Sequence, residues 1–294
     1  MTAISEVRPR VAVAERAPRS WEIAKRACFY GLLLFWLVVS IGPFWLSVVY
    51  SFMPKEHIYD PPRLIPNPFT LDNYRVVLSE FELFPRWLLN SAIISGVLTV
   101  VRTLFCAMGG YAFARMKFPG RNLLFTLTLV TMMIPGQVTL IPNYIVIGPG
   151  VFHLLDRLEA VILPGIAGAF GVFMMTQFFK SIPTELEEAA LIDGAGRFTI
   201  FFRLILPISQ TPLLALALFT FQGTWNEFLW PLVVLQTPEK FTLPLGLQWF
   251  KNEYYTLYSN VLAGSLFNSL PIIILFFIFQ RYFIEGIATT GLKE

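Results

Sequence analysis

The residues whose types and spacing form the clearest pattern lie between positions 181 and 207, in a segment that separates two apolar runs. The first half of this segment holds four acidic residues and no basic residue: Glu185, Glu187, Glu188 and Asp193. Thr184 and Glu187 have the spacing of a capping box, and Gly194 stands where a glycine ends a helix. The spacing therefore predicts a short helix, followed by a second amphipathic stretch that ends at Pro207.

The chemistry of this predicted helix suits contact with another protein. Ala189 and Ala190 have small side chains that would let a second surface approach the helix backbone closely. Glu188 and Asp193 would place negative charge at the edge of that contact. The alternative is a helix that rests on lipid headgroups, but such helices favour Lys and Arg on their polar face. The acidic pattern favours docking to a cytoplasmic protein.

A second group of polar residues interrupts an apolar run farther along the chain: Gln222, Trp225, Asn226 and Glu227. A carboxylate at the centre of a membrane helix costs about 2.5–3.5 kcal/mol on insertion scales, so Glu227 needs a partner or water. Amide and carboxylate groups hydrogen-bond hydroxyls, and Trp packs against a sugar ring. We expect these residues, together with Asn90, to line a solute pathway; the alternative is that they satisfy one another structurally.

Two further features lie inside apolar runs. Pro135 and Gly136 predict a kink whose freed carbonyl groups would face a cavity, although a kink that only packs is an equal alternative. Arg102 and Glu227 would differ in depth by about 13 Å at 1.5 Å per residue, which predicts no direct ion pair. Arg102 is expected to extend toward the interface or to meet carbonyl groups at a helix end.

The elements that must position these residues are membrane helices. The chain has 294 residues, of which 55% are hydrophobic and 14% charged, and its mean hydropathy is +0.63. Soluble domains carry about 25% charged residues. This composition excludes a water-soluble enzyme and a disordered or fibrous chain. It predicts an all-α, polytopic membrane protein.

Apolar runs of about 20 residues predict six membrane spans. They lie near residues 28–52, 87–112, 123–146, 160–180, 208–235 and 261–283. Residues 1–26 would form a polar cytoplasmic tail, and residues 27–294 a single six-span domain. The tail, the connections after the second and fourth spans and the C-terminus hold 14 of the 22 Lys and Arg residues. This bias predicts that both termini are cytoplasmic.

Other function classes lack their motifs. An intramembrane metalloenzyme needs clustered ligands, but the two histidines, His57 and His153, lie far apart, and neither belongs to a His-Glu-x-x-His motif. No Gly-x-Ser-x-Gly sequence is present, so no catalytic residue and no metal site are predicted. A self-contained secondary transporter would show internal repeats, and none is evident. The basic residues form no stripe for nucleic acid.

The segment from Glu188 to Pro207 resembles the EAA signature of the permease subunits of binding-protein-dependent ABC importers. Glu188-Ala189-Ala190 is followed after three residues by Gly194, and nine further residues precede Leu204, which replaces the usual Ile. Other motifs resemble the six-span subunit of maltose-type sugar permeases: Asn73-Tyr74, Asn90-Ser91, Tyr111 to Arg115, Phe118 to Gly120, Ile134-Pro135 and Trp225 to Phe228. The resemblance covers about residues 40–294.

This resemblance implies a transport subunit of a bacterial-type inner membrane, with a coupling helix docked on an ATP-hydrolysing subunit. The implied coupling residues are Glu188, Ala189, Ala190, Asp193, Gly194, Leu204 and Pro207. Pro135 and Gly136 would lie near the gate. The implied partners are a second permease subunit, two ATP-binding cassette subunits, an extracytoplasmic solute-binding protein and a sugar.

The chain itself would bind no cofactor. It has no Gly-x4-Gly-Lys-Ser/Thr loop, so ATP and Mg would be held by the partner ATPase subunits. An importer for a non-sugar solute is the main alternative, and an ATP-independent secondary transporter is a weaker one.

Overall fold

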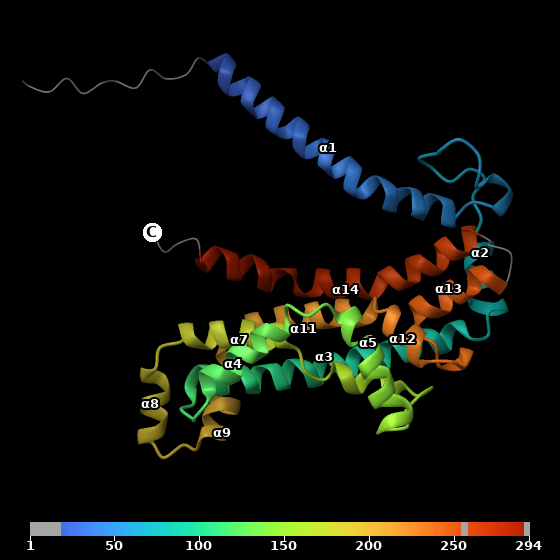
Figure 1. Ribbon diagram of the computed structural model, residues 1–294. Helices are drawn as coiled ribbons and strands as arrows, with labels where there is room; N and C mark the ends of the chain where they lie inside the picture. The colour runs from blue at the N-terminus through green and yellow to red at the C-terminus, as the bar shows by residue number, and fades with distance from the viewer. Residues whose placement is uncertain (1–18, 254–257, 291–294) are drawn as a thin grey trace, which may run out of the picture.

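The computed structural model describes residues 19–253 and 258–290, and every regular element in these ranges is helical (Figure 1). The principal helices are α1 (Arg19–Ser51), α3 (Phe84–Arg115), α4 (Arg121–Thr131), α5 (Gly136–Ile145), α7 (Ala169–Ser181), α11 (Gln210–Trp225), α13 (Leu243–Glu253) and α14 (Tyr258–Thr290). The shorter helices are α2 (Asp72–Arg75), α6 (Leu158–Ile162), α8 (Glu185–Ile192), α9 (Arg197–Ile200), α10 (Leu206–Ile208) and α12 (Leu229–Val234). The expected all-α class is confirmed for the described residues.

Four of the predicted spans correspond to helices long and apolar enough to cross a membrane. These are Lys25–Ser51, Phe84–Arg115, Leu158–Ser181 and Tyr258–Gln280. The first helix starts at Arg19, so residues 19–26 of the predicted tail are helical, while residues 1–18 lie outside the described ranges. The count reaches six only if two strongly bent helix pairs each form one span.

The predicted third span is broken, not merely kinked. Arg121–Thr131 and Gly136–Gly148 meet at an angle of 101°. Pro135 immediately precedes α5 with an extended ψ of 134°, and its ring offers no N–H group to continue a helix. A proline also disfavours helical backbone at the residue before it. The position of the break is as predicted, and its size exceeds the expectation.

The predicted fifth span, 208–235, is wrong as a single helix. Its central helix, α11, ends at Trp225, and α12 begins only at Leu229. A second bend, of 82°, separates Arg197–Ile208 from Gln210–Trp225. Helix α11 can end here because side chains bond backbone groups at the ends of both helices. The Asn226 amide donates to Gln222 O near the end of α11, and the Glu227 carboxylate accepts the N–H of Trp230 at the start of α12.

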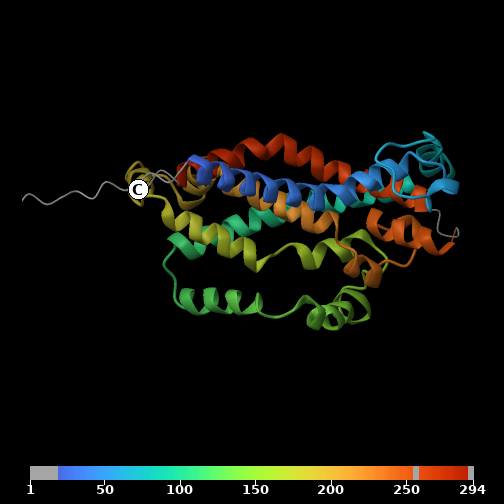
Figure 2. The ribbon, with the colours of Figure 1, turned by 90° about the horizontal axis from the view of Figure 1, so that it is seen from above.

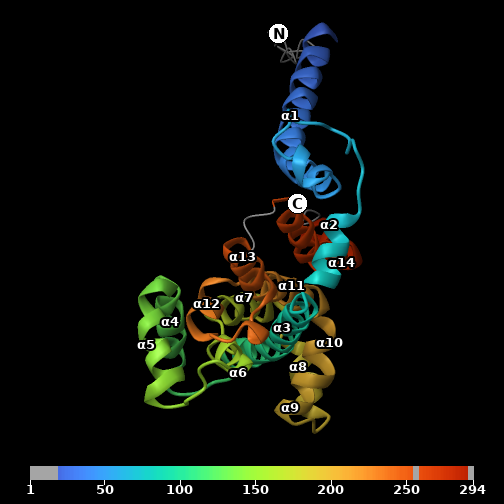
Figure 3. The same ribbon diagram turned by 90° about the vertical axis from the view of Figure 1, so that its right-hand side faces the viewer.

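Helices α3, α7 and α11 form the centre of the molecule (Figures 1 and 3). Close approach of α3 and α7 depends on glycine: a Cβ at Gly110 would lie 2.6 Å from Met175 Cβ, and one at Gly171 would lie 2.6 Å from Cys106 Sγ. Helix α14 covers α11, and α1 contacts α14 but extends away from the rest of the bundle (Figure 3). Helices α4 and α5 stand apart on another side (Figure 2).

The two ends of the bundle carry different elements. Helix α8 runs across one end, and the N-terminal end of α1 and the C-terminal end of α14 point toward this same end (Figure 1). Helices α2 and α13 lie at the opposite end. This arrangement groups together the segments that the Lys and Arg bias assigns to the cytoplasmic side.

Candidate functional site

Helix α8 has the length and the glycine end that the sequence predicts. Gly194 has a φ of +81°, a backbone conformation that favours glycine. The N–H of Gly194 donates to Leu191 O at 3.0 Å, and the N–H of Ala195 donates to Ala190 O at 2.9 Å. These two bonds form a Schellman motif, which ends the helix sharply and satisfies its last carbonyl groups.

The predicted capping box is wrong. The Thr184 side chain makes no cap hydrogen bond, and Glu187 is buried. Instead, Glu187 Oε2 accepts a hydrogen bond from the Tyr111 hydroxyl at 3.0 Å, and Glu187 Oε1 lies 3.0 Å from Arg115 Nε. Arg197 Nη1 lies 3.6 Å from the same carboxylate. Burying an unpaired carboxylate costs more free energy than leaving a helix end without a side-chain cap, so Glu187 pairs with the arginines.

The outer surface of α8 is acidic and apolar. Ile192 is 86% exposed and Leu186 is 45% exposed. The expected coupling residues Glu188, Ala189, Asp193 and Gly194 are also exposed. Ala190 and Leu204 are half-buried against the core cluster that contains Tyr111 and Phe179. We call the exposed face made by Glu185, Leu186, Glu188, Ala189 and Ile192 the α8 surface.

The sequence predicted that the second amphipathic stretch ends at Pro207, and this prediction is wrong. It lies in the first turn of α10, where its missing N–H is tolerated, and the helical stretch continues to Ile208. The break falls at Ser209, whose hydroxyl donates to Ile205 O at 2.6 Å. Pro207 itself is exposed.

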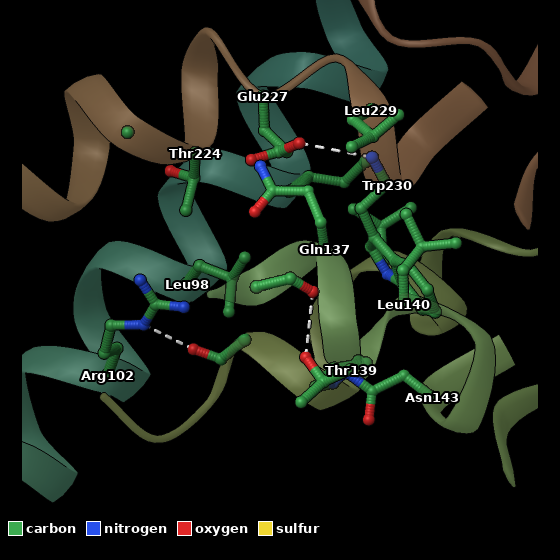
Figure 4. Close-up of a pocket in the computed structure, with 16 residues that line it drawn as sticks. Leu98, Arg102, Gln137, Thr139, Leu140, Asn143, Thr224, Glu227, Leu229 and Trp230 are labelled. Carbon is green, nitrogen blue, oxygen red and sulfur yellow. Dashed lines mark hydrogen bonds between the residues drawn. The ribbon is translucent and has the colours of Figure 1, made fainter. Parts of the chain in front are cut away.

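A second candidate site is a cavity of about 560 Å³ between α5 and the helices α3, α11 and α12 (Figure 4). Its wall comes from α3, α5, the α6–α7 segment and the α11–α12 link. The polar side chains on this wall are Arg102, Gln137, Thr139, Asn143, Thr224 and Glu227. Leu98, Leu140 and Trp230 are among the apolar ones. Such a mixture can hydrogen-bond a polyhydroxylated solute and pack against its apolar faces.

Arg102 is oriented by a carbonyl group at a helix end, as predicted. Its Nε donates to Gly165 O, in the turn that follows α6. Glycine at position 165 leaves room for the side chain, because a Cβ there would lie 3.3 Å from Nη2. Among the described residues, no ion pair joins Arg102 to Glu227, although both line the cavity (Figure 4).

Glu227 lies in the cavity wall, but the expectation that it sits within a helix is wrong. It occupies the link between α11 and α12 and is exposed. Its Oε1 accepts the N–H of Trp230 at 3.2 Å, which satisfies a free backbone group in the first turn of α12. The carboxylate is therefore held at a helix start with access to the cavity. Gly136, at the start of α5, also lines the cavity, whereas Pro135 does not.

Four other expected pathway residues lie outside this wall. Trp225 is buried, and its Nε1 donates to Asn268 O at 2.8 Å. Asn90 is buried, and its Nδ2 donates to Glu239 O and Phe241 O, each at 2.9 Å. Gln222 and Asn226 are exposed but border other hollows. The structure therefore does not bring these four residues together with the cavity wall, and their role in a solute pathway stays a prediction.

The sequence reasoning missed the polar residues of α5. Gln137, Thr139 and Asn143 line the cavity from one helix. The available signal was the presence of two amide side chains in an apolar run, where an unsatisfied amide is costly. It also missed the ion pair of Glu187, although Tyr111 and Arg115 have the i, i+4 spacing that places them on one helix face.

Asp156 fastens together two connections near the end opposite α8. Its Oδ1 accepts the N–H groups of Gln236 and Thr237, each at 2.9 Å, and its Oδ2 lies 2.9 Å from Lys240 Nζ. Partial burial raises the pKa of the Asp156 carboxyl, but the hydrogen bonds from Thr237, Lys240 and the two backbone amides outweigh it and hold the pKa well below its usual range. The described residues contain no cluster of His, Cys, Asp or Glu that could hold a metal ion.

Comparison with known proteins places this geometry in a family. Residues 100–288 match the family described as the binding-protein-dependent transport system inner membrane component. The chain belongs to this family. Its members are transport subunits, so the α8 surface and the cavity are parts of a permease and not of an enzyme.

The similarity to known proteins covers most of the permease. It is 38% identical over 263 residues to the arabinooligosaccharides transport system permease protein AraQ of Halalkalibacterium halodurans, covering 87% of this chain and 92% of that protein. It is 30% identical to the sn-glycerol-3-phosphate transport system permease protein UgpE of Escherichia coli, covering 87% and 93%. Its fold matches a chain of a bacterial ABC transporter for alginate with a TM-score of 0.80, at 24% identity, covering 92% of this chain and 100% of that one.

Proposed function

We propose that this permease forms half of the translocation pathway of an ATP-driven importer for a carbohydrate. In this proposal, α8 docks on a separate ATPase subunit, and the cavity between α3, α5 and α12 is part of the solute pathway. The observation that carries it is the position of an exposed, acidic and apolar α8 across one end of the bundle. The family match supports a transport role.

The α8 surface supports docking for two physical reasons. Ile192 and Leu186 leave apolar area in water that a partner would cover. Glu185 and Glu188 flank this area with negative charge, which favours a basic cleft on the partner. The Schellman end at Gly194 holds the helix at a fixed length, so contact with a partner meets a stiff element.

The cavity supports a hydroxyl-rich solute. Gln137, Asn143 and Thr139 offer neutral donors and acceptors, and Glu227 offers a charged acceptor. Trp230 and Leu140 offer apolar surface. The relative from Halalkalibacterium halodurans is named for arabinooligosaccharide transport, which agrees with this chemistry.

Partners and orientation follow from the same proposal. The end with α8 faces the cytoplasm with both termini, and the end with α2 and α13 faces a solute-binding protein. A second permease subunit completes the pathway, and two ATPase subunits hold ATP and Mg. The exposed apolar surfaces of α1 and α5 support contact with lipid or with that second subunit; Leu34 and Phe35 are each 61% exposed, and Val138 is 65% exposed.

A docking variant tests the proposal. The transport complex is purified through a tag on this chain, and the ATPase subunit that accompanies it is quantified. Ala189→Trp should abolish co-purification, because a bulky ring on the α8 surface prevents close approach to the backbone. Tyr59→Trp, at an 81% exposed position on the other end, should leave co-purification unchanged. Normal co-purification of the Ala189→Trp variant would refute docking through α8.

An anionic solute is the second candidate. Arg102 places a guanidinium on the cavity wall, and the relative from Escherichia coli is named for sn-glycerol-3-phosphate transport. A complex reconstituted in vesicles with its binding protein decides between the two. Stimulation of ATP hydrolysis by an arabinooligosaccharide but not by glycerol 3-phosphate supports the carbohydrate, and the reverse result supports the anion.

A further inference from the structure

Three elements meet around one buried carboxylate beneath α8. The side chain of Glu187 is 5% exposed and that of its partner Arg115, at the end of α3, is 7% exposed. Arg197, in the first turn of α9, reaches the same carboxylate from its other side and is 47% exposed. Tyr111 donates its hydroxyl to Glu187 Oε2 at 3.0 Å. We call Glu187, Tyr111, Arg115 and Arg197 the Glu187 cluster.

Arg115 binds the α8 region at two points. Its Nε lies 3.0 Å from Glu187 Oε1, as an ion pair whose N–H group is not aimed at the oxygen. Its Nη2 donates to Ile182 O, in the backbone that leads into α8. One guanidinium therefore holds the first turn of α8 and the backbone between α7 and α8 against the end of α3.

The packing around the cluster is tight. The Tyr111 ring contacts Phe179 of α7 and Phe201, which follows α9, with ring centroids 6.2 Å and 5.2 Å apart. One residue before Tyr111, a Cβ at Gly110 would lie 3.0 Å from the backbone of Met175, so α7 is pressed against α3 at this level. Helices α3 and α7 and the segment after α9 therefore form one packed block, to which α8 is tied by Glu187 and by Ala190, which packs on the same apolar cluster.

Helix α3 connects this block to the cavity without interruption. Arg102, on the cavity wall, precedes Tyr111 by nine residues on the same helix. Nine residues span about 14 Å at a rise of 1.5 Å per residue. Leu98 and Ile94 continue the contact of α3 with the cavity one and two turns farther on. A displacement of the end of α3 is thus carried along a single rigid element.

We propose that the Glu187 cluster makes α8 and α3 move as one unit, so that a push on α8 reaches the cavity through α3. Glu187 is then a positioning residue, because it acts through Arg115 and Tyr111 and not by touching the ATPase or the solute. The inference rests on the proposed docking of α8 to an ATPase subunit. It assigns separate tasks to adjacent acids: Glu188 faces the partner, and Glu187 faces the permease.

The test compares transport with ATP hydrolysis in the intact complex. The complex of permeases, ATPase subunits and binding protein is reconstituted in vesicles, and sugar uptake is divided by ATP hydrolysed. Glu187→Gln should lower this ratio by at least about fivefold, the lower end of typical coupling effects, in complexes that still assemble. Glu159→Gln removes an exposed acid that lies outside both the α8 surface and the cavity wall, and it should leave the ratio unchanged.

Two further variants keep the test decisive if Glu187→Gln does not assemble. Tyr111→Phe removes only a hydroxyl and should lower the ratio in the same direction. The double variant Glu187→Arg with Arg115→Glu should recover part of the ratio that either single variant loses. A Tyr111→Phe complex with the parental ratio, or a double variant no better than the singles, refutes the inference. A parental complex without ATP-driven uptake would instead refute the proposed function, and the inference with it.

Discussion

Backbone carbonyl groups hold many of the polar side chains where helices of this permease meet. The Arg102 guanidinium bonds Gly165 O, the Trp225 indole bonds Asn268 O, and the Trp230 indole bonds Ala160 O at 3.0 Å. Each bond satisfies a polar group that would be costly if buried alone. The side chain of Glu227 differs, because it is exposed and its charge is only partly satisfied by one N–H group.

Replacing Glu227 by Gln tests whether this charge meets the solute. The Gln side chain retains an oxygen that can accept the Trp230 N–H, so the start of α12 should persist and the complex should assemble. Uptake should fall about tenfold, because a hydrogen bond to a charged group contributes about 1.5–3 kcal/mol. Glu239→Gln, an exposed acid outside the cavity, serves as the control. Unchanged uptake by the Glu227 variant would assign the carboxylate a purely structural role.

Asp156 provides a stability prediction with a defined pH dependence. Asp156→Asn should lower the free energy of unfolding by about 1–3 kcal/mol, because an amide cannot accept all the donors that surround this side chain. The depressed pKa of Asp156 means that its contribution is complete above the ordinary Asp pKa of about 3.9 and is lost as the pH falls through the folded value.

Thermal unfolding in detergent at pH 7 and near pH 3 measures this effect. The difference between the parent and the Asp156→Asn variant should be large at pH 7 and should shrink toward about pH 3. Glu159→Gln, an exposed acid three residues away, should not change the midpoint at either pH. A difference that is the same at both pH values would contradict the role of the charge.

Among the helices, α8 has a local geometry that can be tested directly for its effect on transport. Its end depends on the positive φ of Gly194, which costs a residue with a Cβ about 1–2 kcal/mol. Gly194→Val should loosen the last turn of α8 and lower uptake, while the amount of protein in the membrane stays unchanged. The matched control is Gly196→Val, since Gly196 has a φ of −75° and open space around its Cβ position.

Uptake and membrane abundance of both variants are measured in cells. The expected result is reduced uptake for Gly194→Val and near-parental uptake for Gly196→Val. Equal uptake by the two variants would show that the helix end at Gly194 is not needed for transport.

Local rules predicted the helix boundaries that a single Gly or Pro sets better than those that depend on contacts with other residues. The glycine end of α8 and the break at Pro135 follow from the backbone limits of single residues. The end of α11 at Trp225 does not, because it depends on Glu227 serving the start of α12. Glu187 shows the same limit: its spacing from Thr184 fits a cap, but Arg115, 72 positions earlier in the chain, offers a stronger partner.

The whole molecule leaves large apolar surfaces on α1 and on the α4–α5 pair. Trp36 of α1 is 57% exposed, Met133 before α5 is 82% exposed, and Ile141 within α5 is 67% exposed. A soluble monomer seldom exposes contiguous apolar area of this extent. These surfaces require lipid or another membrane subunit, which agrees with the proposal that a second permease subunit completes the pathway.

The grouping of segments at the two ends of the bundle gives a prediction for the whole molecule. If the end with α8 faces the cytoplasm, Ile192→Cys should react with a membrane-impermeant maleimide only after the cells are opened, whereas Tyr59→Cys should react in intact cells. Both positions are more than four-fifths exposed in this chain, and the permease is produced without ATPase subunits, so that a docked partner does not cover residue 192. The parent residues Cys28 and Cys106 are replaced by Ser in both variants, so that the label reports one site. Reaction of the residue 192 variant in intact cells would reverse the orientation, place α8 beyond the reach of a cytoplasmic ATPase and end the proposal that it transmits the energy of ATP hydrolysis.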